Sequence, residues 1–282
     1  MDNDHNGQIV NELEALVLKY NSVAMEYLRL ENYKESLMLL KKAEEILNSD
    51  ENQIIPNRLK LMGITLNNLG CYYKKRKQNK VALTFLEKAL EVELQTESDN
   101  VNLAGSHLNL CAAFSSLSRH KEGYQHAKQA LALLESVYGN ESMSFEKTVT
   151  LITSLVITYY NAGVELEYMS RYSEALAHYQ SGFDIARKEL GYKHQMTMNL
   201  LETIKKVSKK SKIADRSKSN ARESKTPMRK YRILEEKVFT GFGNRLPSVY
   251  RNKRATEKPV STRNKIETAY DKLRDMTFQA PL

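Results

Sequence analysis

The sequence predicts an all-α solenoid of antiparallel helix pairs, and three observations support this fold class. Apolar residues recur with helical periodicity over most of residues 8–208. The 282 residues include only 5 Pro and 11 Gly, which is too few for the turns of an all-β chain of this length. A pattern of small residues, with the second 12 positions and the third 19 positions after the first, also occurs four times, at Ala24-Ser36-Ala43, Gly70-Ala82-Ala89, Cys111-Gly123-Ala130 and Gly163-Ala175-Gly182.

This spacing is a packing pattern. Two antiparallel helices approach closely only where one of the facing side chains is small and a larger neighbour fills the adjoining space. When the pattern recurs in the same phase, each helix pair stacks on the next and the pairs form a continuous core. We therefore expect the first small residue of each copy, namely Ala24, Gly70, Cys111 and Gly163, to be buried where the paired helices meet.

The helices are predicted in order along the chain. Residues Asn32 and Tyr33 form the first turn, Pro56 ends any helix before it, and Asp99 or Asn100 can cap the helix that follows. In a fifth copy the small position is occupied by Lys205, so we expect a single capping helix there instead of a pair. The expected helices are about 8–30, 34–48, 58–76, 79–96, 101–118, 121–138, 144–169, 172–190 and the capping helix 194–208.

The copies resemble the tetratricopeptide repeat (TPR) family, most closely in "TLNNLGCYYKK…KVALTFLEKALEVE" at 65–93 and in residues 159–186. The copies recur at 41 to 52 residues, which exceeds the usual 34-residue TPR period and resembles the longer repeats of the kinesin-light-chain subgroup. The resemblance implies a TPR superhelical solenoid over residues 1–208. Its repeats lie at about 17–50, 63–96, 104–137 and 156–189, followed by the capping helix 194–208.

The last part of the chain differs sharply in charge. Residues 1–200 contain 21 Lys and Arg against 25 Asp and Glu, a net charge of −4, whereas residues 201–282 contain 22 against 9, a net charge of +13. We expect residues 209–282 to form a basic, largely disordered tail, because its first part has almost no apolar residues with which to form a core. Within it, 239–250 is predicted to be a docking motif and 264–276 a short amphipathic helix.

Composition also excludes several classes of protein. The sequence has no run of 18 apolar residues, so no membrane-spanning segment is predicted. Its acidic start lacks the basic and apolar regions of a signal peptide, and Cys71 and Cys111 fit reduced thiols. We expect a cytoplasmic protein, associated with the cytoskeleton or a cilium. No cofactor is predicted.

The resemblance also implies a binding groove. In TPR folds the residue two before the small position faces the concave surface, and here those residues are Ser22, Asn68, Asn109 and Asn161. A carboxamide has a donor and an acceptor, so it can bond both groups of a peptide backbone. We expect an Asn ladder whose side chains are free in the unliganded protein. The alternative is that the Asn residues only solvate a helix face.

Charged residues flank this ladder. Lys74 and Lys75 lie near it in the second repeat, whereas Glu167 and Tyr168 hold the matching places in the fourth, so one end of the groove should be basic and the other acidic. The TPR subtype that clamps a C-terminal carboxylate needs further basic residues in an adjacent repeat, where this chain has Ser115 and Ser116. A carboxylate clamp is therefore the less favoured interpretation.

No catalytic constellation appears. His107 and Cys111 have the i, i+4 spacing of metal-ligand pairs, but no second pair accompanies them and both fall on core positions, so a packed core is expected. Phosphate loops, nucleophile elbows and zinc motifs are absent from the sequence. We therefore predict a non-enzymatic scaffold or adaptor that binds a peptide or helix of a protein partner.

The tail allows three interpretations. It could dock on an acidic protein surface, with tubulin in the microtubule lattice as a candidate, it could bind RNA or DNA, or it could be a solvated spacer. A TPR solenoid beside a basic tail that carries a docking motif favours the first interpretation, in which the tail docks on an acidic protein surface. The expected anchors are Phe239, Phe242, Leu246 and Tyr250, and phosphorylation of Thr226 would weaken the contact.

Overall fold

The computed structural model describes the chain except for residues 1, 50–54, 56, 97, 140–142 and 224–282, and it describes side chains between 10 and 214. The docking motif, the amphipathic helix and Thr226 lie outside the described residues. The described part is helical without strands, and the fold class is confirmed. Its helices are α1 (Asp2–Arg29), α2 (Tyr33–Asn48), α3 (Arg58–Lys75), α4 (Asn79–Glu93), α5 (Asn100–Ser116), α6 (His120–Val137), α7 (Phe145–Tyr168), α8 (Tyr172–Glu189) and α9 (Gln195–Glu223).

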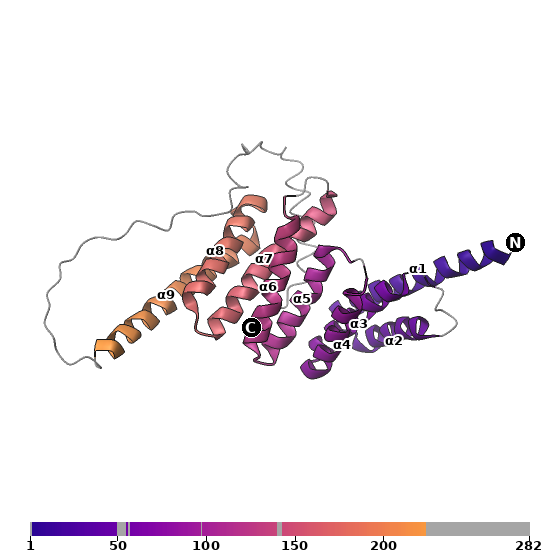
Figure 1. Cartoon of the computed structure of the whole chain (residues 1–282), viewed down its shortest axis with the longest axis horizontal. Coiled ribbons are helices and arrows are strands. Elements are labelled where there is room, and N and C mark those ends of the chain that lie inside the picture. The colour runs from indigo at the N-terminus through magenta and orange to yellow at the C-terminus, as the bar shows by residue number, and fades with distance from the viewer. Residues whose placement is uncertain (1, 50–54, 56, 97, 140–142, 224–282) are drawn as a thin grey trace.

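The helices form four pairs that stack one after another, as Figure 1 shows. The pairs are α1 with α2, α3 with α4, α5 with α6 and α7 with α8, and the second helix of each pair contacts the first helix of the next. The first helices also contact one another in sequence, α1 with α3, α3 with α5, and α5 with α7. We call the surface formed by α1, α3, α5 and α7 the first-helix face.

The small residues lie where the paired helices meet, as predicted. Ala24, Gly70, Cys111 and Gly163 are all buried, and so are the second and third small residues of each copy. A Cβ atom on Gly70 would lie 2.5 Å from the Leu86 side chain of α4, the partner helix. The predicted repeat phase is therefore confirmed at atomic detail.

The turn inside each pair has the same geometry in all four repeats. Seven residues after the first small residue, the backbone adopts a left-handed conformation with φ between 57° and 60°, at Glu31, Lys77, Ser118 and Ser170. The next residue donates its N–H to a carbonyl five residues back, as in Arg119 N to Phe114 O at 2.9 Å. This is the hydrogen bond of a Schellman motif, in which the left-handed position usually holds Gly.

Ser118→Gly should therefore stabilise the protein. A left-handed conformation costs a residue with a Cβ about 1–2 kcal/mol, and the greater freedom of Gly in the unfolded chain offsets part of that gain. We expect the free energy of unfolding to rise by about 0.5–1 kcal/mol, measured by chemical denaturation. Ser118→Ala is the control and should leave stability unchanged. A loss of stability in the Gly variant would contradict this interpretation of the turn.

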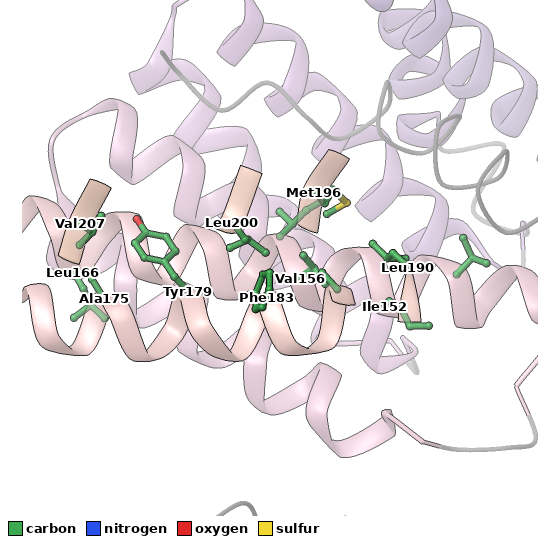
Figure 2. Close-up of a cluster of buried hydrophobic side chains, with 13 residues drawn as sticks. Ile152, Val156, Leu166, Ala175, Tyr179, Phe183, Leu190, Met196, Leu200 and Val207 are labelled. Atoms are coloured by element: carbon green, nitrogen blue, oxygen red, sulfur yellow. The ribbon is translucent and has the colours of Figure 1, made fainter. Parts of the chain in front are cut away.

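The largest core cluster lies between α7, α8 and α9. Tyr179 and Phe183 of α8 pack against Val156 of α7 and Leu200 of α9, as Figure 2 shows. Tyr179 is fully buried. By length and composition α7 could cross a membrane, but 61% of its apolar window is buried inside the solenoid, which is the environment of a core helix.

The capping helix is longer than predicted. It was expected to end at 208, but α9 continues to Glu223, so the predicted start of the tail at 209 does not coincide with the end of the helix. Val207 and Ser211 remain buried on the side of α9 that faces the solenoid. Ala, Lys and Arg are good helix formers, and a helix already nucleated by tertiary contacts extends at little cost. Figure 1 shows α9 extending beyond α7 and α8.

Candidate functional site

The Asn ladder lies on the first-helix face. Asn68, Asn109 and Asn161 are half-buried on α3, α5 and α7, and Ser22 is exposed on α1. The side chains of the ladder meet the preceding repeat, because Asn68 Nδ2 donates to Asn21 Oδ1 at 2.9 Å. The predicted ladder residues therefore lie on successive first helices, and Asn68 also joins its repeat to the preceding one.

A second hydrogen bond repeats this geometry one step along. Asn109 Nδ2 donates to Asn67 Oδ1 at 3.0 Å, so the residue two before the small position bonds the residue three before it in the previous repeat. Asn21 in turn donates to Thr65 Oγ1 at 2.9 Å. The expectation that the carboxamides are free is wrong for Asn68 and Asn109, because successive first helices approach closely enough for these side chains to bond each other.

Asn161 differs from the other two. The residue that should accept its amide proton in the third repeat is Leu108, which has no side-chain acceptor. Within the part of the chain that the structure describes, no hydrogen bond engages the Asn161 side chain. Its donors and acceptor are all available to a ligand, whereas Asn68 and Asn109 each use one of their two amide N–H groups within the fold.

The second repeat supplies the basic end of the face. Lys74 and Lys75 are half-buried at the end of α3, and Arg29 is exposed at the end of α1. Lys75 Nζ lies 3.7 Å from Glu31 Oε1, a weak ion pair in which the Glu31 side chain is mostly exposed. Lys74 forms no ion pair with a carboxylate in the described ranges. The predicted Lys74 and Lys75 thus lie together at the end of α3, and in the described ranges neither Lys74 nor Arg29 forms an ion pair.

The fourth repeat does not supply a free acidic end. Glu167 Oε1 accepts a hydrogen bond from Lys210 Nζ of α9 at 2.5 Å, and Glu167 Oε2 accepts one from the Tyr179 hydroxyl at 3.3 Å. The prediction of an acidic end is therefore wrong, because Lys210 of the capping helix compensates the charge of Glu167. Tyr168, which stays 64% exposed, is the accessible residue at this end.

Sequence reasoning missed a buried Glu–His hydrogen bond beside Tyr168. Glu165 is only 2% exposed, and its Oε2 lies 2.7 Å from His120 Nδ1, a residue of the previous repeat. Burial raises the pKa of the Glu165 carboxyl above its ordinary value, while hydrogen bonds from Ser115 and His120 act to lower it. The imidazole also stacks on the Tyr168 ring, with the ring centroids 4.2 Å apart.

Gly123 makes room for this pair. A Cβ on Gly123 would lie 3.2 Å from the carboxyl carbon of Glu165. No sequence signal pointed to the contact, because the residues at the position of Glu165 in the other repeats are Glu26, Tyr72 and Ala113, and His120 is 45 residues away. The pair joins the third repeat to the fourth.

His107 lies in the core, as expected. Together with Cys111 it is buried, and within the described ranges no group of three or more potential ligands forms a metal site. Its Nδ1 lies 2.9 Å from Nδ1 of His126, so one ring must donate and the other accept. Burial, reinforced by the neighbouring His126, lowers the pKa of His107 to about 4.

The histidine pair predicts acid sensitivity. The unfolded chain takes up a proton on His107 near its ordinary pKa of 6.5, whereas the folded chain resists protonation down to about 4. Stability should fall as pH drops through this window and should level off below it, because both states are then protonated. Between pH 7.5 and pH 5 we expect a loss on the order of 1–2 kcal/mol from this residue, after allowance for solvent screening.

Denaturation curves at several pH values measure this effect. Replacing His107 by Gln keeps a polar side chain that does not titrate, and should flatten the dependence between pH 7 and pH 5. Burial also lowers the pKa of His126 and His178, so part of the slope should remain. An unchanged slope in the Gln variant would show that His107 titrates normally in the fold.

Comparison with known proteins agrees with this architecture. The family model for the tetratricopeptide repeat matches residues 64–92, which is the second repeat predicted from the sequence. Two crystal structures of nearly identical TPR-like repeats from a putative kinesin light chain of Podosopora anserina are similar, with TM-scores of 0.55 and 0.54. Each is 16% identical, over 73% of this chain and 93% of the other.

A bacterial protein has a similar fold. Aspartyl phosphate phosphatase F from Bacillus subtilis aligns with a TM-score of 0.51 and 17% identity, over 78% of this chain and 54% of its own. No curated protein matches the sequence. At these identities the similarities show the fold and not the function.

Proposed function

We propose that this chain, which folds as a tetratricopeptide-repeat solenoid resembling kinesin-light-chain-type repeats, is a non-enzymatic scaffold that binds a protein partner on the first-helix face. The observation that carries the proposal is the Asn ladder: one residue type occupies the same place in three successive repeats, on one surface. Asn68 and Asn109 use one amide N–H each to join neighbouring repeats, and the carboxamide groups that remain, with the whole of Asn161, match the donors and acceptors of a peptide backbone.

The spacing of the ladder suits an extended peptide. Packed helices lie about 8–10 Å apart, and an extended chain advances about 3.3 Å per residue. Successive carboxamides therefore meet every third residue of a peptide that runs across the helices. Asn161 offers a donor and an acceptor, while Asn68 and Asn109 offer their Oδ1 atoms to peptide N–H groups.

Charge favours an acidic ligand at one end. Lys74, Lys75 and Arg29 lie at the end of the ladder formed by the first two repeats, where acidic side chains of a peptide would be stabilised. Ser115 and Ser116 stand where a carboxylate clamp would need basic residues, so internal acidic residues fit this face better than a chain end. Tyr168 gives an aromatic contact at the opposite end.

The basic tail extends this scaffold. Its net charge supports docking on an acidic protein surface, such as tubulin in the microtubule lattice, through Phe239, Phe242, Leu246 and Tyr250. This role would place the protein in the cytoplasm, on the cytoskeleton or in a cilium. Phosphorylation of Thr226 would add negative charge and weaken the contact.

Nucleic acid is the second candidate partner of the tail, because the same Lys and Arg residues would release counterions from phosphates. A salt series separates the two candidates. Binding to RNA should fall log-linearly and steeply with salt, whereas docking through aromatic anchors should depend on salt much less.

Asn161→Ala tests the ladder. The Asn161 carboxamide has no partner in the fold that the variant would lose, so stability should stay within about 0.5 kcal/mol of wild type. Affinity for peptides selected on the full-length protein from a displayed random library should fall about tenfold, the equivalent of one to two hydrogen bonds. Titration calorimetry measures the affinity, and chemical denaturation measures the stability.

Asn48→Ala is the matched control, since Asn48 is exposed at the end of α2, away from the first-helix face. It should bind every selected peptide as wild type does. Replacing Asn68 and Asn109 as well should deepen the loss of binding but also cost about 1 kcal/mol per internal bond. Wild-type affinity in the Asn161 variant would remove the ladder as the binding site.

A further inference from the structure

The outer side of α9 carries a row of lysines. Val207 and Ser211 are buried toward the solenoid. Lys205, Lys209 and Lys212, spaced at i, i+4 and i+7, are exposed and lie on the opposite side of the helix. We call these three residues the lysine stripe. At 1.5 Å of rise per residue, it spans about 10 Å along the helix axis.

The neighbouring lysines differ from the stripe in having partners. Lys206 Nζ lies 2.8 Å from Glu202 Oε1, and Lys210 is bonded to Glu167 of α7. None of the three stripe residues forms an ion pair with a carboxylate in the described part of the chain. Lys210 thus joins α9 to α7, Lys206 is paired within α9 itself, and the three stripe residues are directed outward.

The stripe has an energetic cost to the helix. Like charges at i, i+4 and i, i+3 destabilise a helix by about 0.2–0.5 kcal/mol per pair, and the stripe contains one pair of each kind. Glu202 acts electrostatically on Lys205, but in the described residues no stripe lysine forms an ion pair with a carboxylate. A ligand that supplies negative charge would remove this repulsion, so the stripe is prepared for an anionic partner.

We propose that the lysine stripe docks an acidic segment of a partner protein whose carboxylates stand about 6 Å apart, as Glu residues do at i, i+4 on a helix or i, i+2 in an extended chain. This inference builds on the scaffold function proposed above and adds a second contact, separate from the Asn ladder. It names acidic protein as the partner class for the last helix.

Charge and composition favour protein over nucleic acid at this surface. The exposed side of α9 between Lys205 and Lys212 has no aromatic side chain on which a base could stack. Residues 1–200 have a net charge of −4, which disfavours approach of a long polymer with one charge per phosphate. A short acidic segment can contact the stripe without lying over the rest of the solenoid.

Carbodiimide cross-linking of the full-length chain to a peptide of twelve glutamates tests the proposal, because the reagent joins a lysine amine to a carboxylate only when they are in contact. Mass spectrometry then gives the yield at each lysine. The stripe residues should react at least fivefold more than Lys42, Lys88 and Lys128, which are exposed on α2, α4 and α6. Equal yields at the two sets would overturn the proposal.

A charge reversal provides the second arm. Lys209→Glu should lower the yields at Lys205 and Lys212 about tenfold by placing a repelling carboxylate between them, and Lys88→Glu, with the same change in net charge, should leave them unchanged. Full protection of the stripe by single-stranded RNA of equal charge at physiological salt would assign it to nucleic acid and overturn the proposal. Asn161→Ala should not alter these yields, so failure of the ladder and failure of the stripe are distinguishable.

Discussion

Gly163→Ala should lower the free energy of unfolding by about 2–3 kcal/mol, although Ala is the better helix former. The added Cβ would lie 2.5 Å from Cε1 of Tyr179 and 2.8 Å from two other atoms of that ring. Such distances require the ring or the helix to move. Overpacking of a well-packed core typically costs 1–3 kcal/mol.

Tyr179 has little freedom to give way. The ring is fully buried in the cluster between α7, α8 and α9 (Figure 2), and its hydroxyl donates a hydrogen bond to Glu167. Gly163→Ala/Tyr179→Leu should therefore be less destabilised than the sum of the two single variants, because the leucine removes the ring that the new methyl meets. A double-mutant cycle from denaturant titrations measures this coupling.

Gly105→Ala is the matched control. Gly105 is also inside a first helix, α5, but a Cβ there would meet no atom within 4 Å. The substitution should stabilise the protein by about 0.5–1 kcal/mol through helix propensity alone. If the two variants behaved alike, Gly163 would not be the close contact between α7 and α8.

The pairing of helices could be predicted from the sequence because its determinants are local. Gly163 and Tyr179 are only 16 residues apart. The same pattern of small residues recurs in each copy, so the helix pairing predicted from one copy can be checked against the other three. The non-Gly residues at the left-handed turns, such as Lys77, had no sequence signal. Turn geometry there follows from the pairing of the helices and not from the turn residues.

Contacts between repeats were not predictable in this way. The acceptor for Asn68 is a residue of the preceding repeat, and the acceptor position for Asn161 is filled by Leu108, so the same ladder position is bonded in one repeat and open in another. Lys210 compensates Glu167 only because α9 extends past its predicted end. Each of these contacts joins two individual residues and does not recur in every repeat, so a repeating sequence pattern cannot reveal it.

The buried pair between the third and fourth repeats should be the most sensitive of these contacts. His120→Ala leaves the Glu165 carboxylate buried without its imidazole partner, with Ser115 as its remaining side-chain donor. Leaving a buried carboxylate without its partner typically costs about 3–5 kcal/mol, and leaving a neutral buried group unpaired costs about 1–3 kcal/mol. We expect about 3 kcal/mol at pH 7.5, since His120 itself is partly exposed.

The loss should depend on pH with a definite sign. Without His120, burial raises the pKa of Glu165 further above its ordinary value, so the folded variant binds a proton at a higher pH than the unfolded chain does. The stability of the variant is then lost as pH rises through that folded pKa and recovered as pH falls. The difference from wild type should shrink between pH 7.5 and pH 5.

Glu165→Gln separates the effect of a charge on the Glu165 carboxyl from simple packing. The amide keeps the shape and a hydrogen bond to His120 but removes the buried charge, so Glu165→Gln should cost less than His120→Ala, and adding it to His120→Ala should recover part of the lost stability. Amide hydrogen exchange in α7 and α8 locates the effect, since loosening of this joint should expose those helices before α1 to α4. A loss that is independent of pH and spread evenly over all four repeats would show that Glu165 carries no charge in the native fold.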